Sequence, residues 1–272
     1  MLRTLRKAPL SAKIGMIVIA CYVLIAVFAG VIAPFGETEV VAYEFEPWGG
    51  DYLLGTDNLG RDTFSRLIYA ARNTLGIAAL ATLLAFCVGG TLGLIAATIG
   101  GWTDQLLSRL VDVLMAIPAL IFALLLLTIL GPNLVNMIIV IALIDSTRVF
   151  RLTRAVAMNV VVMDFVEAAQ VRGEGLGWII RREILPNITA PLVAELGLRF
   201  CFVFLTISAL SFLGLGIQPP AADWGSMVRE SASLITFGDI TPLLPAAAIG
   251  ILTVSINMVV DWMLHMSSGL QD

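Results

Sequence analysis

The chain has 272 residues, of which 59% are hydrophobic and 13% are charged. Ordinary globular domains are about 45–50% apolar and about 25% charged, so this composition excludes a soluble protein. Uncharged runs longer than about 18 residues indicate transmembrane helices, and the formal net charge of −4 then matters less than where the charges lie.

The N-terminal part is predicted to contain one retained span and one outward segment. Residues 1–13 are basic and form a short N-terminus. Residues 14–35 are uncharged and long enough to cross the ~30 Å hydrocarbon core as the first transmembrane helix. This run is too long for the apolar part of a signal peptide. Residues 36–72 are acidic at first and then show turn residues and an amphipathic helical pattern.

Residues 73–265 are predicted to form a core of five further helices. The second span lies within residues 73–103, where small residues recur every four positions. Such a stripe lets helix backbones approach closely in lipid, so we interpret it as a packing feature. The stripe consists of Ala81, Ala85, Gly89, Gly93 and Ala97.

The other four spans follow in chain order. The turn Gly131-Pro132-Asn133 separates the third span from the fourth. The expected ranges are 106–130, 134 to the charges at 145–154, 192–213 and 242–264, with residues 266–272 as the C-terminus.

Lysine and arginine placement predicts the orientation. If the N-terminus is cytoplasmic, twelve of the 16 basic residues fall on the inside. This positive-inside bias predicts cytoplasmic termini and a cytoplasmic loop at residues 155–191, and it places residues 36–72 outside.

Residues 164–191 are the long polar interval of the second half. Asp164 to Arg172 is a predicted short helix that ends at Gly173. Leu176 to Glu183 is a second one, which we expect to stop before Pro186 because the residue preceding a proline disfavours α geometry. Composition alone favours an ordinary solvated loop.

Several kinds of chemistry are absent from the sequence. There is no G-x-x-x-x-G-K-[ST] phosphate loop, so ATP binding by that route is not expected. Ser/His/Asp, H-E-x-x-H and paired-cysteine patterns are also missing, and we expect neither catalytic nor metal residues. Asp112, Asp145 and Asp261 are expected near span ends, where pairing with arginine or water is favoured over a proton or ion relay.

Three separated motifs carry a likeness to a known family. Glu167-Ala168-Ala169 with Gly173 and Ile184-Leu185-Pro186 resembles the cytoplasmic EAA loop of ABC-importer membrane subunits, the binding-protein-dependent permeases. Residues 55–66 (GTDNLGRDTFSR) and 210–225 (LSFLGLG, then PP and WG) are similar to signatures of the dipeptide/oligopeptide/nickel permease group. The likeness runs from about residue 13 to the C-terminus and is greatest to the subunit with a short N-terminus. Glu183, where the group usually has His, and the extra Gly175 and Gly177 depart from the pattern.

The resemblance implies an all-α integral membrane protein with six transmembrane helices, the type I ABC importer permease fold and a cytoplasmic coupling (EAA) loop. The ATPase-coupling residues that it implies are Glu167, Ala168, Ala169, Arg172, Gly173, Ile184, Leu185 and Pro186. The candidate docking residues for a binding protein are Asp57, Arg61, Asp62, Arg66 and Trp224.

The implied function is that of a permease subunit in an ATP-driven importer of dipeptides or oligopeptides in the bacterial inner (plasma) membrane. Its implied partners are a homologous permease subunit, two ATP-binding subunits that carry ATP and Mg²⁺, an extracytoplasmic substrate-binding protein and membrane lipid, but no nucleic acid. No cofactor is expected on this chain.

Two kinds of alternative stay open. The first is the same machinery importing nickel chelates, opines or oligosaccharides. A stand-alone ion-coupled secondary transporter is the alternative of a different class, but it would need acids in the middle of the membrane.

Overall fold

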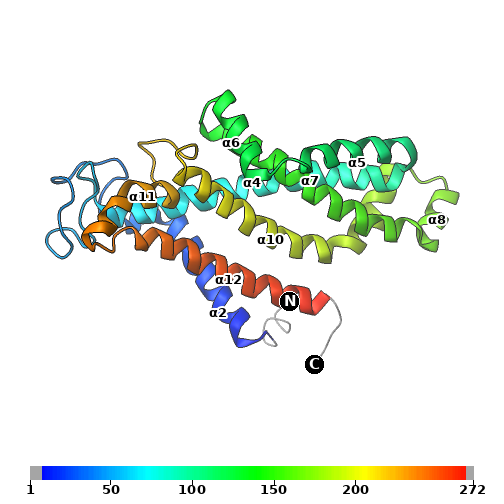
Figure 1. Cartoon of the computed structure of the whole chain (residues 1–272). Coiled ribbons are helices and arrows are strands. Elements are labelled where there is room, and N and C mark those ends of the chain that lie inside the picture. The colour runs from blue at the N-terminus through cyan, green and yellow to red at the C-terminus, as the bar shows by residue number, and fades with distance from the viewer. Residues whose placement is uncertain (1–7, 268–272) are drawn as a thin grey trace.

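The structure is a computed structural model that describes residues 8–267, so parts of the predicted N- and C-termini lie outside the described residues. Within this range every regular element is a helix, and the remaining β structure is two isolated bridges, Val40 with Arg61 and Thr56 with Asp62. The molecule is elongated, with α8 at one end and the loops of residues 36–62 beside α11 at the other (Figure 1).

The helices follow the predicted order. They are α2 (Leu10–Val27), α3 (Ala29–Ile32), α4 (Thr63–Ile99), α5 (Gly101–Met115), α6 (Ala119–Leu130), α7 (Leu134–Val161), α8 (Asp164–Val171), α9 (Leu176–Ile179), the π-helical turn η1 (Ile180–Ile184), α10 (Leu185–Phe212), α11 (Trp224–Ser231), the 3₁₀ turn η2 (Ala232–Phe237) and α12 (Leu243–Ser267).

The all-α membrane fold is confirmed, whereas the count of six spans stays a prediction. Four helical stretches in the described chain are long and apolar enough to cross a membrane, and a fifth is reached if α5 and α6 form one broken span. α7 has 28 residues, enough to cross, but Asp145, Arg148 and Arg151 interrupt its apolar run.

Two predicted helix boundaries are wrong. The amphipathic stretch before the second span and the span itself form one helix of 37 residues, α4, which begins at Thr63 because the Asp62 carboxylate caps the Ser65 N–H. It ends at Gly100, where φ is +65°. The predicted span 106–130 is broken: α5 and α6 meet at 86° because Pro118 has no N–H to continue the first helix and stands at the N-cap of the second.

The small-residue stripe of α4 packs as predicted. Ala81 and Ala85 are fully buried, and a Cβ atom built on Gly89 would lie 2.2 Å from the Ser146 carbonyl oxygen of α7. One built on Gly93 would lie 2.8 Å from the Phe150 carbonyl oxygen. The absence of side chains at these two glycines therefore allows the backbones of α4 and α7 to touch.

The position of Asp145 near a span end stays a prediction, but Asp145 does not lie near the end of its helix. Asp145 is buried close to the middle of α7, because this helix continues to Val161, well past the charges that were expected to end it. Those charges find partners inside the bundle: Asp145 pairs with Arg199 of α10, and Arg154 pairs with Asp104 of α5.

Candidate coupling and docking sites

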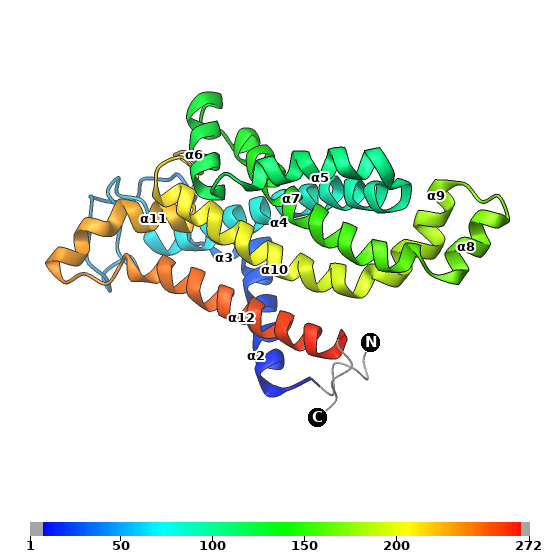
Figure 2. The ribbon, with the colours of Figure 1, turned by 45° about the vertical axis from the view of Figure 1, so that its right-hand side comes forward.

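α8, α9 and η1 form a protrusion (residues 164–184) that extends past the ends of the long helices (Figure 2). The first predicted helix and its stop are confirmed: α8 ends at Val171, Arg172 caps it, and Gly173 has a φ of +81°. The Gly173 N–H donates to the Gln170 carbonyl at 2.9 Å, and the Glu174 N–H donates to that of Ala169 at 3.1 Å. Glycine is suited to this left-handed position because it has no Cβ.

The expected stop before Pro186 is wrong. Helical backbone runs from α9 through η1 into α10 without a break, and Pro186 lies in the first turn of α10. The chain widens to a π-helical turn just before the proline, a common way of accommodating a residue that cannot continue the α ladder. The Asn187 side-chain amide also donates to the Glu183 carbonyl at 2.6 Å.

The structure divides the predicted coupling residues into a buried and an exposed set. Ala169 and Ile184 are fully buried in a small apolar core beneath the protrusion, together with Val166, Ile179 and Ile188. This core fixes the angle between the two short arms. Leu185 is half-buried, and the exposed members are Glu167, Ala168, Arg172, Gly173 and Pro186.

Glu183, which departs from the family pattern, faces the first arm. Its Oε1 atom lies 4.0 Å from Nη2 of Arg172, and the two side chains are 22% and 56% exposed. An ion pair this long and this exposed contributes little to stability, about 0–1 kcal/mol. Both charges are therefore available to a partner.

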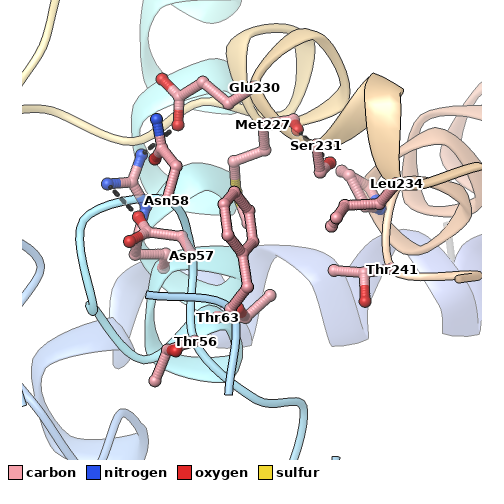
Figure 3. Close-up of a pocket in the computed structure, with 12 residues that line it drawn as sticks. Thr56, Asp57, Asn58, Thr63, Met227, Glu230, Ser231, Leu234 and Thr241 are labelled. Atoms are coloured by element: carbon pink, nitrogen blue, oxygen red, sulfur yellow. Dashed lines mark hydrogen bonds and ion pairs between the residues drawn. The ribbon is translucent and has the colours of Figure 1, made fainter. Parts of the chain in front are cut away.

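At the other end of the molecule, the residues of the first signature form a buried ion-pair network. Asp57 Oδ2 lies 2.7 Å from Arg61 Nε and 3.0 Å from Arg66 Nη1. Glu230 of α11 closes the network, with Oε2 3.3 Å from Arg66 Nη2 and 3.7 Å from Arg61 Nη2. Burial raises the pKa of Glu230, against the lowering effect of Arg61. Figure 3 shows Asp57 and Glu230 in the wall of the adjoining pocket, with dashed lines marking their ion pairs.

Trp224, from the other signature, holds α11 against the long helices. It is 2% exposed, its indole N–H donates to the Leu67 carbonyl at 3.1 Å, and its ring packs edge-on against Tyr22 and Phe204. Asp223, just before it, caps α11 by accepting from the Gly225 and Ser226 N–H groups.

The predicted docking residues are thus mostly covered in this chain. Arg61, Asp62, Arg66 and Trp224 are between 1% and 4% exposed. Arg61 and Arg66 instead hold the loop before α4 and the first turn of α4 to Glu230 of α11. Their role in docking stays a prediction.

Sequence reasoning missed two carboxylates of this end. Glu230 lies 164 positions from Arg66, and Glu37 accepts from the Asn73 side chain at 2.7 Å and from the Ala222 N–H at 2.6 Å. Neither residue belongs to a local motif, so only the folded chain identifies their partners.

No group of three or more His, Cys, Asp or Glu residues that could hold a metal ion occurs in the described range 8–267. The predicted coupling residues and the buried ion-pair network lie at opposite ends of the molecule and contain no nucleophile placed beside a base.

Comparison with known proteins shows which family this chain matches and which proteins it is similar to. Residues 89–268 match the family described as "Binding-protein-dependent transport system inner membrane component". The "Dipeptide transport system permease protein DppC" of Alkalihalophilus pseudofirmus is 36% identical over 92% of this chain and 83% of its own length. The "Di/tripeptide transport system permease protein DppC" of Pseudomonas aeruginosa is 36% identical over 91% of this chain and 84% of its own. The "Glutathione transport system permease protein GsiD" of Pectobacterium atrosepticum is 30% identical over 88% and 80%.

Proposed function

This chain belongs to the family of binding-protein-dependent transport system inner membrane components and is a multi-pass permease subunit of an ABC transport system. From this premise we propose that it forms half of an import path for small peptides. The proposal includes a heterodimer with a homologous permease chain. An extracytoplasmic binding protein delivers the peptide to this dimer.

The protrusion is the observation that supports coupling to ATP. It is a short two-armed element whose form is fixed by a buried core and whose exposed charges include Glu167 and Arg172. It also joins α7 directly to α10, so a displacement of the protrusion moves both helices. We infer that two separate ATP-binding subunits, which carry ATP and Mg²⁺, dock here and drive alternating access.

The proposed cargo follows from the names of the relatives. Those names state dipeptides, di/tripeptides and glutathione, which are all short peptides. Nickel chelates, opines and oligosaccharides remain alternatives for the same machinery. We expect the separate binding protein to set most of the specificity.

The coupling role is tested with Glu167→Lys. This exposed carboxylate lies on the outer face of α8, and reversing its charge opposes any basic group that it meets on an ATPase. We expect the variant to insert in the membrane at the normal level, to lose co-purification of the ATPase and to lose ATP-driven peptide uptake. Western blots of membranes, affinity purification and uptake of a labelled dipeptide measure these three properties.

Glu44→Lys is the control. Glu44 is equally exposed but lies in the outward segment, so its charge reversal is expected to leave ATPase co-purification unchanged. If Glu167→Lys retained the ATPase and the wild-type uptake rate, the proposed coupling through this face would be wrong.

A further inference from the structure

Four charged side chains meet near the middle of two long helices of the bundle. Asp145 and Arg148 lie near the middle of α7, and Glu195 and Arg199 lie near the middle of α10. These two helices are the ones that the protrusion connects. The middle of a helix that crosses a membrane lies deep in the bilayer, where ionisable groups are costly to place and commonly mark a substrate or ion pathway.

Arg199 is the centre of this charged cluster (Asp145, Arg148, Glu195 and Arg199). Its Nε lies 2.7 Å from Glu195 Oε1, its Nη1 lies 3.5 Å from Asp145 Oδ1, and its guanidinium carbon lies 4.7 Å from the centre of the Phe202 ring. Only 12% of the side chain is exposed. Two carboxylates and an aromatic face therefore already surround the Arg199 charge.

Arg148 differs from Arg199 in both exposure and pairing. Its side chain is 41% exposed, and its one ion-pair contact within residues 8–267 is a separation of 4.0 Å between Nη1 and Asp145 Oδ1. A guanidinium has five N–H donors in a planar fork that matches a carboxylate. Most of these donors have no acid at hydrogen-bond distance in the described chain.

The environment of Arg148 follows from the cost of a charge in lipid. A guanidinium that faced the hydrocarbon in the middle of the bilayer would be strongly disfavoured. The exposed side of Arg148 is therefore better explained by a water-filled path or by the partner permease than by lipid. The cluster as a whole is neutral, with two acids and two arginines.

We propose, resting on the proposed function, that Arg148 binds the terminal carboxylate of a peptide as it passes between the two permease subunits. Asp145 and Arg199 position it, because Asp145 lies between the two guanidinium groups. Neutrality of the cluster keeps the attraction weak, which release on the other side requires. Since α7 and α10 flank the protrusion, ATPase movement changes this contact between the two states of the path.

The test uses the complete transporter in proteoliposomes, with the binding protein loaded to the same measured occupancy with a dipeptide or with its C-terminal amide. A charge-assisted hydrogen bond contributes roughly 1.5–3 kcal/mol, and each 1.4 kcal/mol is a factor of ten. We expect the free acid to be imported about tenfold faster than the amide by the wild type. Arg148→Gln should lower import of the acid to the rate of the amide, and Arg148→Lys should restore part of the difference.

Arg151→Gln is the matched control, since Arg151 is an exposed arginine one turn further along α7 whose described contact is Met115 Sδ at 3.7 Å. It should keep the preference for the free acid. An equal fall in acid and amide import for Arg148→Gln would overturn the proposal and indicate pairing with an acid of the partner permease. An unchanged preference would overturn it as well.

ATPase activity stimulated by the loaded binding protein distinguishes a failure of the carboxylate site from a failure of the proposed function. If the wild type imports peptide with ATP but Arg148→Gln keeps its preference, only the carboxylate site is wrong. If the wild type shows neither ATP-driven import nor stimulation, the proposed function itself is wrong.

Discussion

At the scale of single residues, the glycines of the protrusion differ in the backbone conformation that they adopt. Gly173 has a φ of +81°, whereas Gly175 has an ordinary φ of −73°. A Cβ atom at Gly173, Gly175 or Gly177 would meet nothing within 4 Å. Only Gly173 is therefore required by backbone geometry, and the two extra glycines are not needed to form the turn.

Gly173→Ala is expected to weaken coupling. An L-residue in the left-handed region costs about 1–2 kcal/mol, so part of the population should adopt another turn and misplace the two arms. We expect ATP-driven uptake to fall severalfold while the amount of inserted protein stays normal, as measured by uptake in vesicles and by blotting. Gly175→Ala is the control and should transport as the wild type does. Equal rates in both variants would show that the turn geometry does not matter for coupling.

The residues that pair across the outward end could not be predicted from sequence. The signature at residues 55–66 suggests a docking surface, but Arg61 and Arg66 are buried by Glu230 and Asp57. A charged residue in a polar segment is usually solvated, and a partner 164 positions away gives no local signal. The helix stop in the protrusion was easier to predict because it depends on a single local residue, Gly173.

At the scale of elements, two prolines have different effects on the helix that local sequence rules do not predict. Pro118 and Pro186 both follow apolar helix-forming residues, yet the chain bends by 86° at the first and continues as a helix at the second. Local rules say only that the regular α ladder cannot continue through a proline. Whether the chain bends or widens to a π turn depends on tertiary packing, and Ile184 and Ile188 beside Pro186 are buried in the core of the protrusion.

The contact between α4 and α7 allows a prediction about stability. In Gly89→Ala the new Cβ would lie 2.2 Å from the Ser146 carbonyl oxygen, so the two backbones must separate. Overpacking of this kind costs about 1–3 kcal/mol. We expect the unfolding temperature of the purified protein in detergent to fall by about 2–8 °C.

Gly90→Ala is the matched control on the same helix, at a glycine with open space around it. A Cβ there meets nothing within 4 Å, and alanine in a helix interior is favoured over glycine by roughly 0.5–1 kcal/mol. Its unfolding temperature should be unchanged or slightly raised. A shift of the same sign and size in both variants would mean that the close approach of α4 and α7 does not limit stability.

At the scale of the whole molecule, the two ends differ in structure: one carries the protrusion and the other carries the buried ion-pair network. α8 of the protrusion and α11 lie at opposite ends of the molecule, and α7 and α10 run between them (Figure 1). The ion-pair network includes Glu230 of α11, and the charged cluster lies on α7 and α10. The helical class and the order of the elements were predictable because apolar runs and turn residues are local signals. The positions of the acids in the middle of the bundle were not predictable. A run of mixed charges is typical of the end of a span, and only the folded chain shows their partners.

Orientation is the last property that the arrangement predicts. Arg148 and Arg199 lie near the middle of their helices, and without them ten basic residues are predicted inside against four outside. This positive-inside bias still predicts a cytoplasmic protrusion and an outward position for residues 36–72. After replacement of Cys21, Cys87 and Cys201 by serine, single cysteines at Glu44 and Gln170, both exposed, report the two sides. A membrane-impermeant maleimide should label Glu44→Cys in intact spheroplasts and Gln170→Cys only after permeabilisation. The reverse pattern would place the protrusion where no cytoplasmic ATPase can reach it, and the coupling proposal would fail with it.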